Sequence, residues 1–299
     1  MQLAIELDVN HLFFWDPVAF EGTPFAINRV VLLMLLASLA CILFFVPAAR
    51  RRREGKGRGK MASIGESGYF FVRNQIAIDV IGPKDGPKYA PYLAALFFFI
   101  FFMNLLEVTP LINFPVTSRM AIPAFLALLT YAIFNVIGIW KQGPFRYVWG
   151  TLFPPGVPGL IKPLLAVIEL FSVFVIRPLT LAIRLFANMM AGHVLLTIFF
   201  LFTHEFLVEK FFSFQSTLGI VTFIVACGLI VFELLVIAIQ AYIFTMLTAF
   251  YISESIHGHG EHEGDEEAGE GPPGEKHAEG PAAEQYETEV DDRLSTTAA

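Results

Sequence analysis

Residues 164–202 read LLAVIELFSVFVIRPLTLAIRLFANMMAGHVLLTIFFLF, and this stretch decides the class of the fold. It is mostly apolar and about twice as long as the roughly 20 residues that a helix needs to cross a bilayer. Three charged residues nevertheless interrupt it, namely Glu169, Arg177 and Arg184. Charges at bilayer depth cost about 2.5 to 3.5 kcal/mol each on insertion scales, so they indicate a functional site inside a membrane protein.

Four further apolar runs accompany it, at residues 25–47, 90–106, 121–140 and 218–252. Each reaches or approaches the length of one helical crossing. With 56% hydrophobic residues and 32 phenylalanines, and a mean hydropathy of +0.63, the chain is too apolar for an ordinary soluble domain. We therefore predict an all-α integral membrane protein with five transmembrane helices, of which the last two are long and tilted.

A dense basic block after the first run sets the predicted topology. It comprises Arg50, Arg51, Arg52, Arg53, Lys56, Arg58 and Lys60. Such blocks are retained on the cytoplasmic side of the membrane, so five crossings place the N-terminus outside and the C-terminus in the cytoplasm. No cleavable signal is evident in residues 1–21, and we expect a multi-pass protein of the bacterial plasma membrane.

Residues 68–81 mix large apolar side chains with polar ones such as Arg73 and Asp79. This mixture is typical of an amphipathic helix that lies on a membrane surface, here the cytoplasmic one. The helix is expected to end at Gly82 and Pro83, because glycine and proline break a helix and turn the chain.

The chain divides into three predicted parts: an external segment 1–24, a membrane domain 25–256 and a cytoplasmic tail 257–299. The tail is rich in Glu, Gly, Ala and Pro, and its 13 acidic and two basic residues carry more negative charge than the formal net charge of −7 of the whole chain. It has too few large apolar residues to bury a core, so we expect it to be disordered. Its histidines are weak metal candidates, and we expect neither a metal nor a cofactor. They are His257, His259, His262 and His277.

The polar residues of 164–202 share one helical face. At about 100° per residue they fall within a stripe of roughly 100°. They are Glu169, Arg177, Thr180, Arg184 and Asn188. His193 falls about half a turn from Arg184, so it is expected to face into the subunit while Arg184 faces outward. Pro178 removes a backbone donor and bends the helix, which can shift this phase.

Glu233 and Gln240 lie seven residues apart in the last run and nearly superpose on one helical face. The last two helices run antiparallel, because a short outer loop joins them. Antiparallel packing therefore puts His193 level with Glu233, and Arg184 level with Gln240. A His and Glu pair outside an Arg and Gln pair is what a proton path from the outside, ending at a positive barrier, requires.

Arg184 cannot pass the proton on, because a guanidinium stays protonated at physiological pH. Neither long helix has a carboxylate level with it, since Glu233 is about two turns away and Glu169 lies roughly 22 Å along its helix. The mobile carboxylate is therefore expected on a partner chain.

Three other polar residues have blander interpretations. For Arg177 an ion pair with Glu169 and a role in proton exit both stay open. Asn104 and Glu107 end the second crossing, and we interpret them as anchors at the membrane interface.

The stretch PLTLAIRLFANMMAGH at residues 178–193 strongly resembles the signature helix of subunit a of F-type ATP synthases. FVRNQIAIDVIGP at 71–83 and FFMNLLE at 101–107 resemble the surface helix and second crossing of the same family. The likeness covers most of residues 25–256. Glu107 departs from the small residue expected there, and the acidic tail lies outside the family pattern.

The resemblance implies a non-catalytic, proton-translocating stator subunit. Arg184 would be the essential arginine that separates two aqueous half-channels and faces a ring of c subunits, each with an acidic residue. The residues implied to line the outer half-channel are Asn188, His193, Glu233 and Gln240. Glu169 and Ser172 are implied to lie near the cytoplasmic exit. The implied partners are the c ring, the b subunit of the stator, the other ATP synthase subunits and the lipid bilayer, with no nucleic acid.

Two other classes of function compete with this interpretation. A secondary transporter also places charges at the bilayer midplane, but it normally shows a second, repeat-related half, which this chain lacks. A membrane-embedded hydrolase needs a nucleophile, a base and an orienting group at one depth, and Ser172 has no evident paired histidine. Proton against sodium coupling stays open, because the ion-binding carboxylate is expected on the partner.

Overall fold

The computed structural model describes residues 29–54, 60–109, 116–153, 161–209 and 216–257, and every regular element in these ranges is a helix. The predictions for the external segment 1–24 and for the tail beyond residue 257 lie outside the described residues. His257 itself is the last residue of a helix and not the first of the tail.

Within the described ranges, five helices are long and apolar enough to cross a membrane, which confirms the predicted fold class. The first three are α2 (Arg29–Glu54), α5 (Gly86–Val108) and α6 (Ala121–Gln142). The fourth is a chain of segments that spans Lys162–Val208, and the fifth is α10 (Ser216–His257). The first helix continues past its apolar run into the basic block, with Pro47 inside it.

The fourth crossing is an α-helix interrupted by wider turns. It consists of α8 (Lys162–Phe171), the π-helical segment η3 (Ser172–Ile176), α9 (Arg177–Thr203) and the π-helical segment η4 (His204–Glu209). A π segment has i→i+5 hydrogen bonds and so holds more residues per turn than an α-helix. The helical phase therefore changes at η3, just before Arg177.

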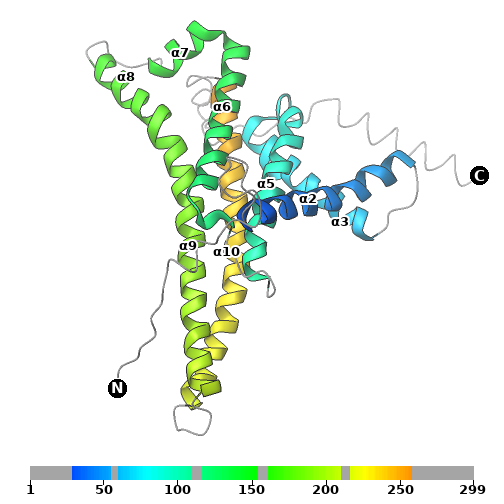
Figure 1. The fold of residues 1–299 in the computed structure, drawn as a ribbon. Helices are drawn as coiled ribbons and strands as arrows, with labels where there is room; N and C mark the ends of the chain where they lie inside the picture. The colour runs from blue at the N-terminus through cyan, green and yellow to red at the C-terminus, as the bar shows by residue number, and fades with distance from the viewer. Residues whose placement is uncertain (1–28, 55–59, 110–115, 154–160, 210–215, 258–299) are drawn as a thin grey trace, which may run out of the picture. The chain divides into compact units, whose positions relative to one another are not determined.

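The two last crossings are too long to stand upright in a bilayer. α10 has 42 residues, or a length of about 63 Å, against a hydrocarbon core of about 30 Å. α9 and α10 lie side by side, and α2 runs crosswise to both (Figure 1). Since α2 has an apolar window of 18 residues that just fits the bilayer, its crosswise direction agrees with a steep tilt of α9 and α10.

The predicted surface helix begins earlier than its amphipathic pattern suggested. It comprises α3 (Lys60–Val72), a π segment η1 (Arg73–Ile78) and α4 (Asp79–Ile81). It buries Val72 and Ile76 and leaves Asn74 exposed, so the amphipathic pattern is present. It ends at Gly82 as predicted, where φ is +100°, a conformation that favours glycine.

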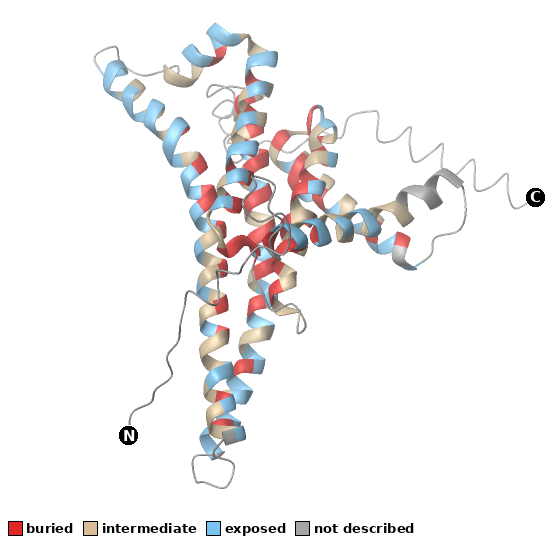
Figure 2. Cartoon of the chain, in the orientation of Figure 1, coloured by how far each residue is buried: buried red, intermediate tan, exposed pale blue. Residues whose placement is uncertain are grey.

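The hydrophobic core lies where α2, α5, α6, α9 and α10 meet. Its fully buried members include Ile100, Met103, Leu185 and Phe244. Figure 2 shows the buried residues concentrated in this region, while most of α8 is exposed. The polar groups described below therefore occupy two kinds of place, the packed centre and the exposed helical surfaces.

A tight turn after α6 folds the chain back. Gly143 has a φ of +82° and is followed by the short helix α7 (Pro144–Leu152). Tyr147 of α7 lies against Gly138, where a methyl group would come within 2.3 Å of its ring, and its hydroxyl donates to Asn135 Oδ1 over 3.2 Å. At the same end of α6, Lys88 and Lys141 donate hydrogen bonds to the Asp85 carboxylate. These hydrogen bonds, the one from Lys88 first, hold the pKa of Asp85 below its usual value.

Candidate functional site

Arg184 lies on an exposed face of α9, as the helical phase predicted. Its exposed neighbours are mostly apolar, with Ile183 45% and Leu179 46% exposed, and the polar Thr180 lies one turn before it. Among the residues that the structure describes, no carboxylate is within ion-pair distance of its guanidinium. A charge on an exposed, apolar helical face inside a crossing is costly for an isolated chain.

Three helices bring a histidine and two carboxylates together in the interior. His193 of α9 is 3% exposed and its Nδ1 lies 3.6 Å from Oε1 of Glu107, which belongs to α5. Glu233 of α10 is 5% exposed. Buried ionisable groups at membrane depth face the interior of a bundle and pair with one another, as His193 and Glu107 do.

Gly192 makes room for the Glu233 side chain. A methyl group at position 192 would lie 2.5 Å from both carboxylate oxygens of Glu233. The contact confirms that Glu233 is level with the segment around His193. Counting eight residues along each helix in opposite directions from Gly192 and Glu233 brings Arg184 opposite Ala241, next to Gln240.

The close contact at Gly192 gives a test of the cluster. We expect Gly192→Ala to push the Glu233 carboxylate away from its position against residue 192, because the added methyl group overlaps it. Passive proton flux through the assembled complex should fall about tenfold, which corresponds to roughly 1.4 kcal/mol. Gly228→Ala is the matched control, because a methyl group on this α10 glycine meets nothing within 4 Å. Equal flux in the two variants would contradict a role for the Glu233 position.

The interpretation of Asn104 and Glu107 as interface anchors is wrong. Both are 0% exposed, and the Thr117 hydroxyl donates to Asn104 Oδ1 over 2.8 Å. Sequence reasoning missed them because their position at the end of an apolar run suggested the membrane surface. Their spacing of three residues, which puts both on one face of α5, was the available signal.

Gln240 and Asn188 differ in burial. Gln240 is 4% exposed and Asn188 is half-buried. The amide nitrogens of both lack a hydrogen-bond partner among the described residues. Buried amides normally have partners, so these two are the kind of group that water or a partner chain serves. Gln240 is level with Arg184 but turned inward, while Arg184 is exposed.

A second polar cluster joins α8, α9 and α10 at the other end of the long helices. Nη2 of Arg177 lies 3.1 Å from Glu169 Oε1 and 2.8 Å from Glu254 Oε1, and its Nη1 contacts Glu254 Oε2. The guanidinium also lies over the Tyr251 ring, 5.2 Å from its centroid. The ion pair of Arg177 with Glu169 is therefore present, and sequence reasoning missed Glu254.

The predicted single polar face of the fourth crossing is only partly correct. Thr180 and Arg184 are exposed, whereas Arg177 is half-buried and turned toward α10. The π segment that begins at Ser172 changes the phase between Glu169 and Arg177. Ser172 itself is half-buried. In the described part of the chain no group of three or more His, Cys, Asp or Glu side chains is placed to hold a metal ion.

The fold and these clusters define a multi-pass, α-helical membrane protein with ionisable side chains held between its spanning helices. The family model described as ATP synthase A chain matches residues 31–253. The chain belongs to this family.

Relatives named ATP synthase subunit a support the same assignment over most of the chain. The chain is 40% identical to that of Rhodococcus erythropolis over 245 residues, which cover 82% of this chain and 88% of the relative. It is 40% identical to that of Frankia alni over 251 residues, 83% of this chain and 84% of the relative. The protein of Parafrankia is 46% identical over 203 residues, 67% of each chain.

Proposed function

We propose that this chain is the proton-translocating stator subunit in the membrane sector of an F-type ATP synthase. It would form two aqueous half-channels that Arg184 separates at the interface with a c ring. Membership in the family supports the general part of this proposal, which is a role in ATP synthesis and proton transport. The proposed role of Arg184 between two half-channels is based on one observation. Its guanidinium is exposed and has no carboxylate partner among the described residues.

The outer half-channel is proposed to run through the buried cluster of α5, α9 and α10. Glu107, His193 and Glu233 supply groups that bind and release protons, and their mutual proximity supports transfer between them. The path is proposed to continue past Asn188 and Gln240 to the level of Arg184. The amide nitrogens of both residues lack a hydrogen-bond partner among the described residues, so they can bind water along this path. Glu107 is an addition to the residues that the sequence suggested, based on its contact with His193.

Arg184 is proposed to act as a fixed positive charge. A carboxylate on the c ring reaches it and loses its proton, because a nearby cation favours the charged form of a carboxyl group. The carboxylate is later reloaded from the outer half-channel. Protons thus pass between the half-channels only by moving with the ring, since the guanidinium itself does not exchange its proton at physiological pH.

The inner half-channel is proposed to open beside the junction of α8 and α9. Glu169 and Ser172 lie there, and both are half-buried. The exposed face of α8 and α9 between them and Arg184, including Thr180, would lie against the ring. ATP chemistry would belong to other subunits, so this chain is a channel component and not itself an enzyme.

The proposed setting is a bacterial plasma membrane, with the N-terminus outside and the C-terminus in the cytoplasm. The relatives are bacterial proteins, and the basic residues at the end of α2 support this orientation. The b subunit of the stator would be a second membrane partner.

Co-purification tests the proposal most directly. In mild detergent we expect this chain to bring down a ring of small, acidic, two-helix subunits together with the soluble ATPase subunits. A disulfide between Thr180→Cys, on the exposed face, and a cysteine placed beside the ring carboxylate should form in the assembled complex. A stable lone chain that binds a solute would instead favour a secondary transporter.

A further inference from the structure

One guanidinium ties three helices together at the end of the long helical pair. Arg177 begins α9 and bonds to Glu169 of α8 and, through two parallel bonds, to Glu254 of α10. All three residues are half-buried, and their side chains are 15%, 20% and 14% exposed respectively. We infer that Glu254 is a positioning residue that, through Arg177, fixes the direction of α8 relative to α9 and α10.

The packing of α8 alone does not fix its direction. None of its ten residues is buried, and Leu164, Val167 and Phe171 are each more than half exposed. In the adjoining π segment only Val173 is buried. A helix with so few buried residues is held weakly by packing against its neighbours, because in a bilayer packing and polar contacts associate helices. The polar contacts of Glu169 therefore carry an unusual share of its attachment.

The junction between α8 and α9 is also built to bend. The π segment η3 runs directly into Arg177, and Pro178 follows with no backbone N–H to donate. Sharp changes of helix direction occur at such prolines and π segments. The wider turns also bring Glu169 and Arg177, eight residues apart, close to the same face, although eight residues of α-helix make about 2.2 turns.

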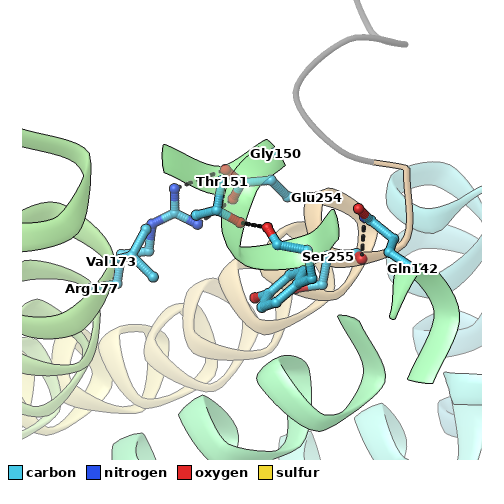
Figure 3. A pocket seen from close by; sticks show the side chains of 8 residues that line it. Gln142, Gly150, Thr151, Val173, Arg177, Glu254 and Ser255 are labelled. Carbon is cyan, nitrogen blue, oxygen red and sulfur yellow. Dashed lines mark hydrogen bonds and ion pairs between the residues drawn. The ribbon is translucent and has the colours of Figure 1, made fainter. Parts of the chain in front are cut away.

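Glu254 lies on a part of α10 that is itself held firmly. The Gln142 amide of α6 donates to the Ser255 carbonyl over 2.8 Å, and Ser253 and Ser255 are 1% and 4% exposed. Figure 3 shows Arg177 and Glu254 at one side of a small polar pocket and the Gln142–Ser255 bond at the other. The pocket has a volume of about 20 Å³. The carboxylate of Glu254 is thus a fixed point to which the junction of α8 and α9 is attached.

The effect of this contact on proton transport depends on the proposed function. Glu169 and Ser172 lie on the α8 side of the junction, and Arg184 lies on the α9 side. The clasp formed by Glu169, Arg177 and Glu254 therefore sets how the inner half-channel is placed relative to the arginine. Arg177 acts here as a connector, and its two parallel bonds to Glu254 give a geometry that a lysine does not reproduce.

A distance measurement in the assembled complex tests the clasp without measuring transport. Spin labels are placed at Val167→Cys on α8 and Phe250→Cys on α10, both exposed positions, with Cys41 and Cys227 replaced by serine. We expect a narrow distance distribution that broadens in Glu254→Gln, because the guanidinium keeps Glu169 of α8 but loses its charged partner on α10. Arg177→Lys, which keeps the charge but not the two parallel bonds, should also broaden it. Lys162→Gln, which removes an exposed α8 charge outside the clasp, is the matched control and should leave it narrow.

Proton pumping and a charge-exchange variant distinguish a positioning role of Glu254 from general damage to the fold. ATP-driven proton pumping by Glu254→Gln should fall about tenfold, a size typical of residues that act through others. The exchange Arg177→Glu with Glu254→Arg should restore both the narrow distribution and most of the pumping. An unchanged distribution in both Glu254→Gln and Arg177→Lys would overturn the inference. If Arg184→Ala proves fully coupled while the clasp variants still broaden the distribution, the proposed function fails and the clasp stands.

Discussion

Replacing Arg184 by alanine is expected to abolish proton-driven ATP synthesis and to open a proton leak. The guanidinium lies exposed on α9 without a carboxylate partner among the described residues, so its removal takes away the only fixed positive charge proposed at the ring interface. Under the proposed function, protons could then pass between the half-channels without ring rotation. We expect ATP synthesis at background and passive flux raised at least about tenfold, a change of roughly 1.4 kcal/mol in the barrier.

The measurement uses the whole complex in vesicles. Passive flux is followed with a pH-sensitive dye under an imposed potential, and synthesis is followed under an imposed proton gradient. Ile183→Ala changes the neighbouring side chain, which is also exposed and large, and should leave both readings close to wild type. An Arg184→Ala complex that still synthesises ATP with normal coupling would contradict the proposal that Arg184 is the barrier to protons between the half-channels.

Replacing Glu233 by glutamine has the second largest expected effect. Glutamine keeps the shape of the side chain beside Gly192 and removes its ability to exchange a proton. Positioned proton-transfer groups contribute about a hundredfold or more to rates, so passive proton flux should fall by about that factor. ATP synthesis should fall with it, and no leak should appear, since Arg184 is still present.

Two comparisons make the Glu233 result specific. Glu66→Gln removes a carboxylate of α3, outside the spanning helices, and should not change flux. Glu107→Gln should lower flux in the same direction as Glu233→Gln, because Glu107 lies beside His193. Wild-type flux in Glu233→Gln would remove this residue from the path.

The sequence was sufficient for the spanning helices because apolar length is a local property. The run predicted at 121–140 is α6 at Ala121–Gln142, and the run at 90–106 is the inner part of α5 at Gly86–Val108. The outward face of Arg184 and the level of Glu233 also follow from regular helical geometry. Both lie in stretches where α9 and α10 are regular α-helices.

The bend of the fourth crossing and the partners of its polar residues could not be predicted, because they depend on three-dimensional geometry that no local sequence pattern encodes. Periodicity assumes 3.6 residues per turn, so the π segment at Ser172 and the rotation it gives to Arg177 were not predictable. Glu254 is 77 residues from Arg177, and only the packing of α10 against α9 brings them together. Glu107 was misjudged for a similar reason, because the helices that bury it are distant in sequence.

The exposed charge of Arg184 also bears on how this chain is made and kept. Under the proposed function, before the ring arrives, the side chain faces lipid at a cost of about 2.5 to 3.5 kcal/mol on insertion scales, on a helical surface that is largely apolar. Under the proposed function, a newly inserted copy is therefore less stable alone than in the complex. We expect its abundance in the cell to follow the supply of the ring, so that unpartnered copies do not accumulate.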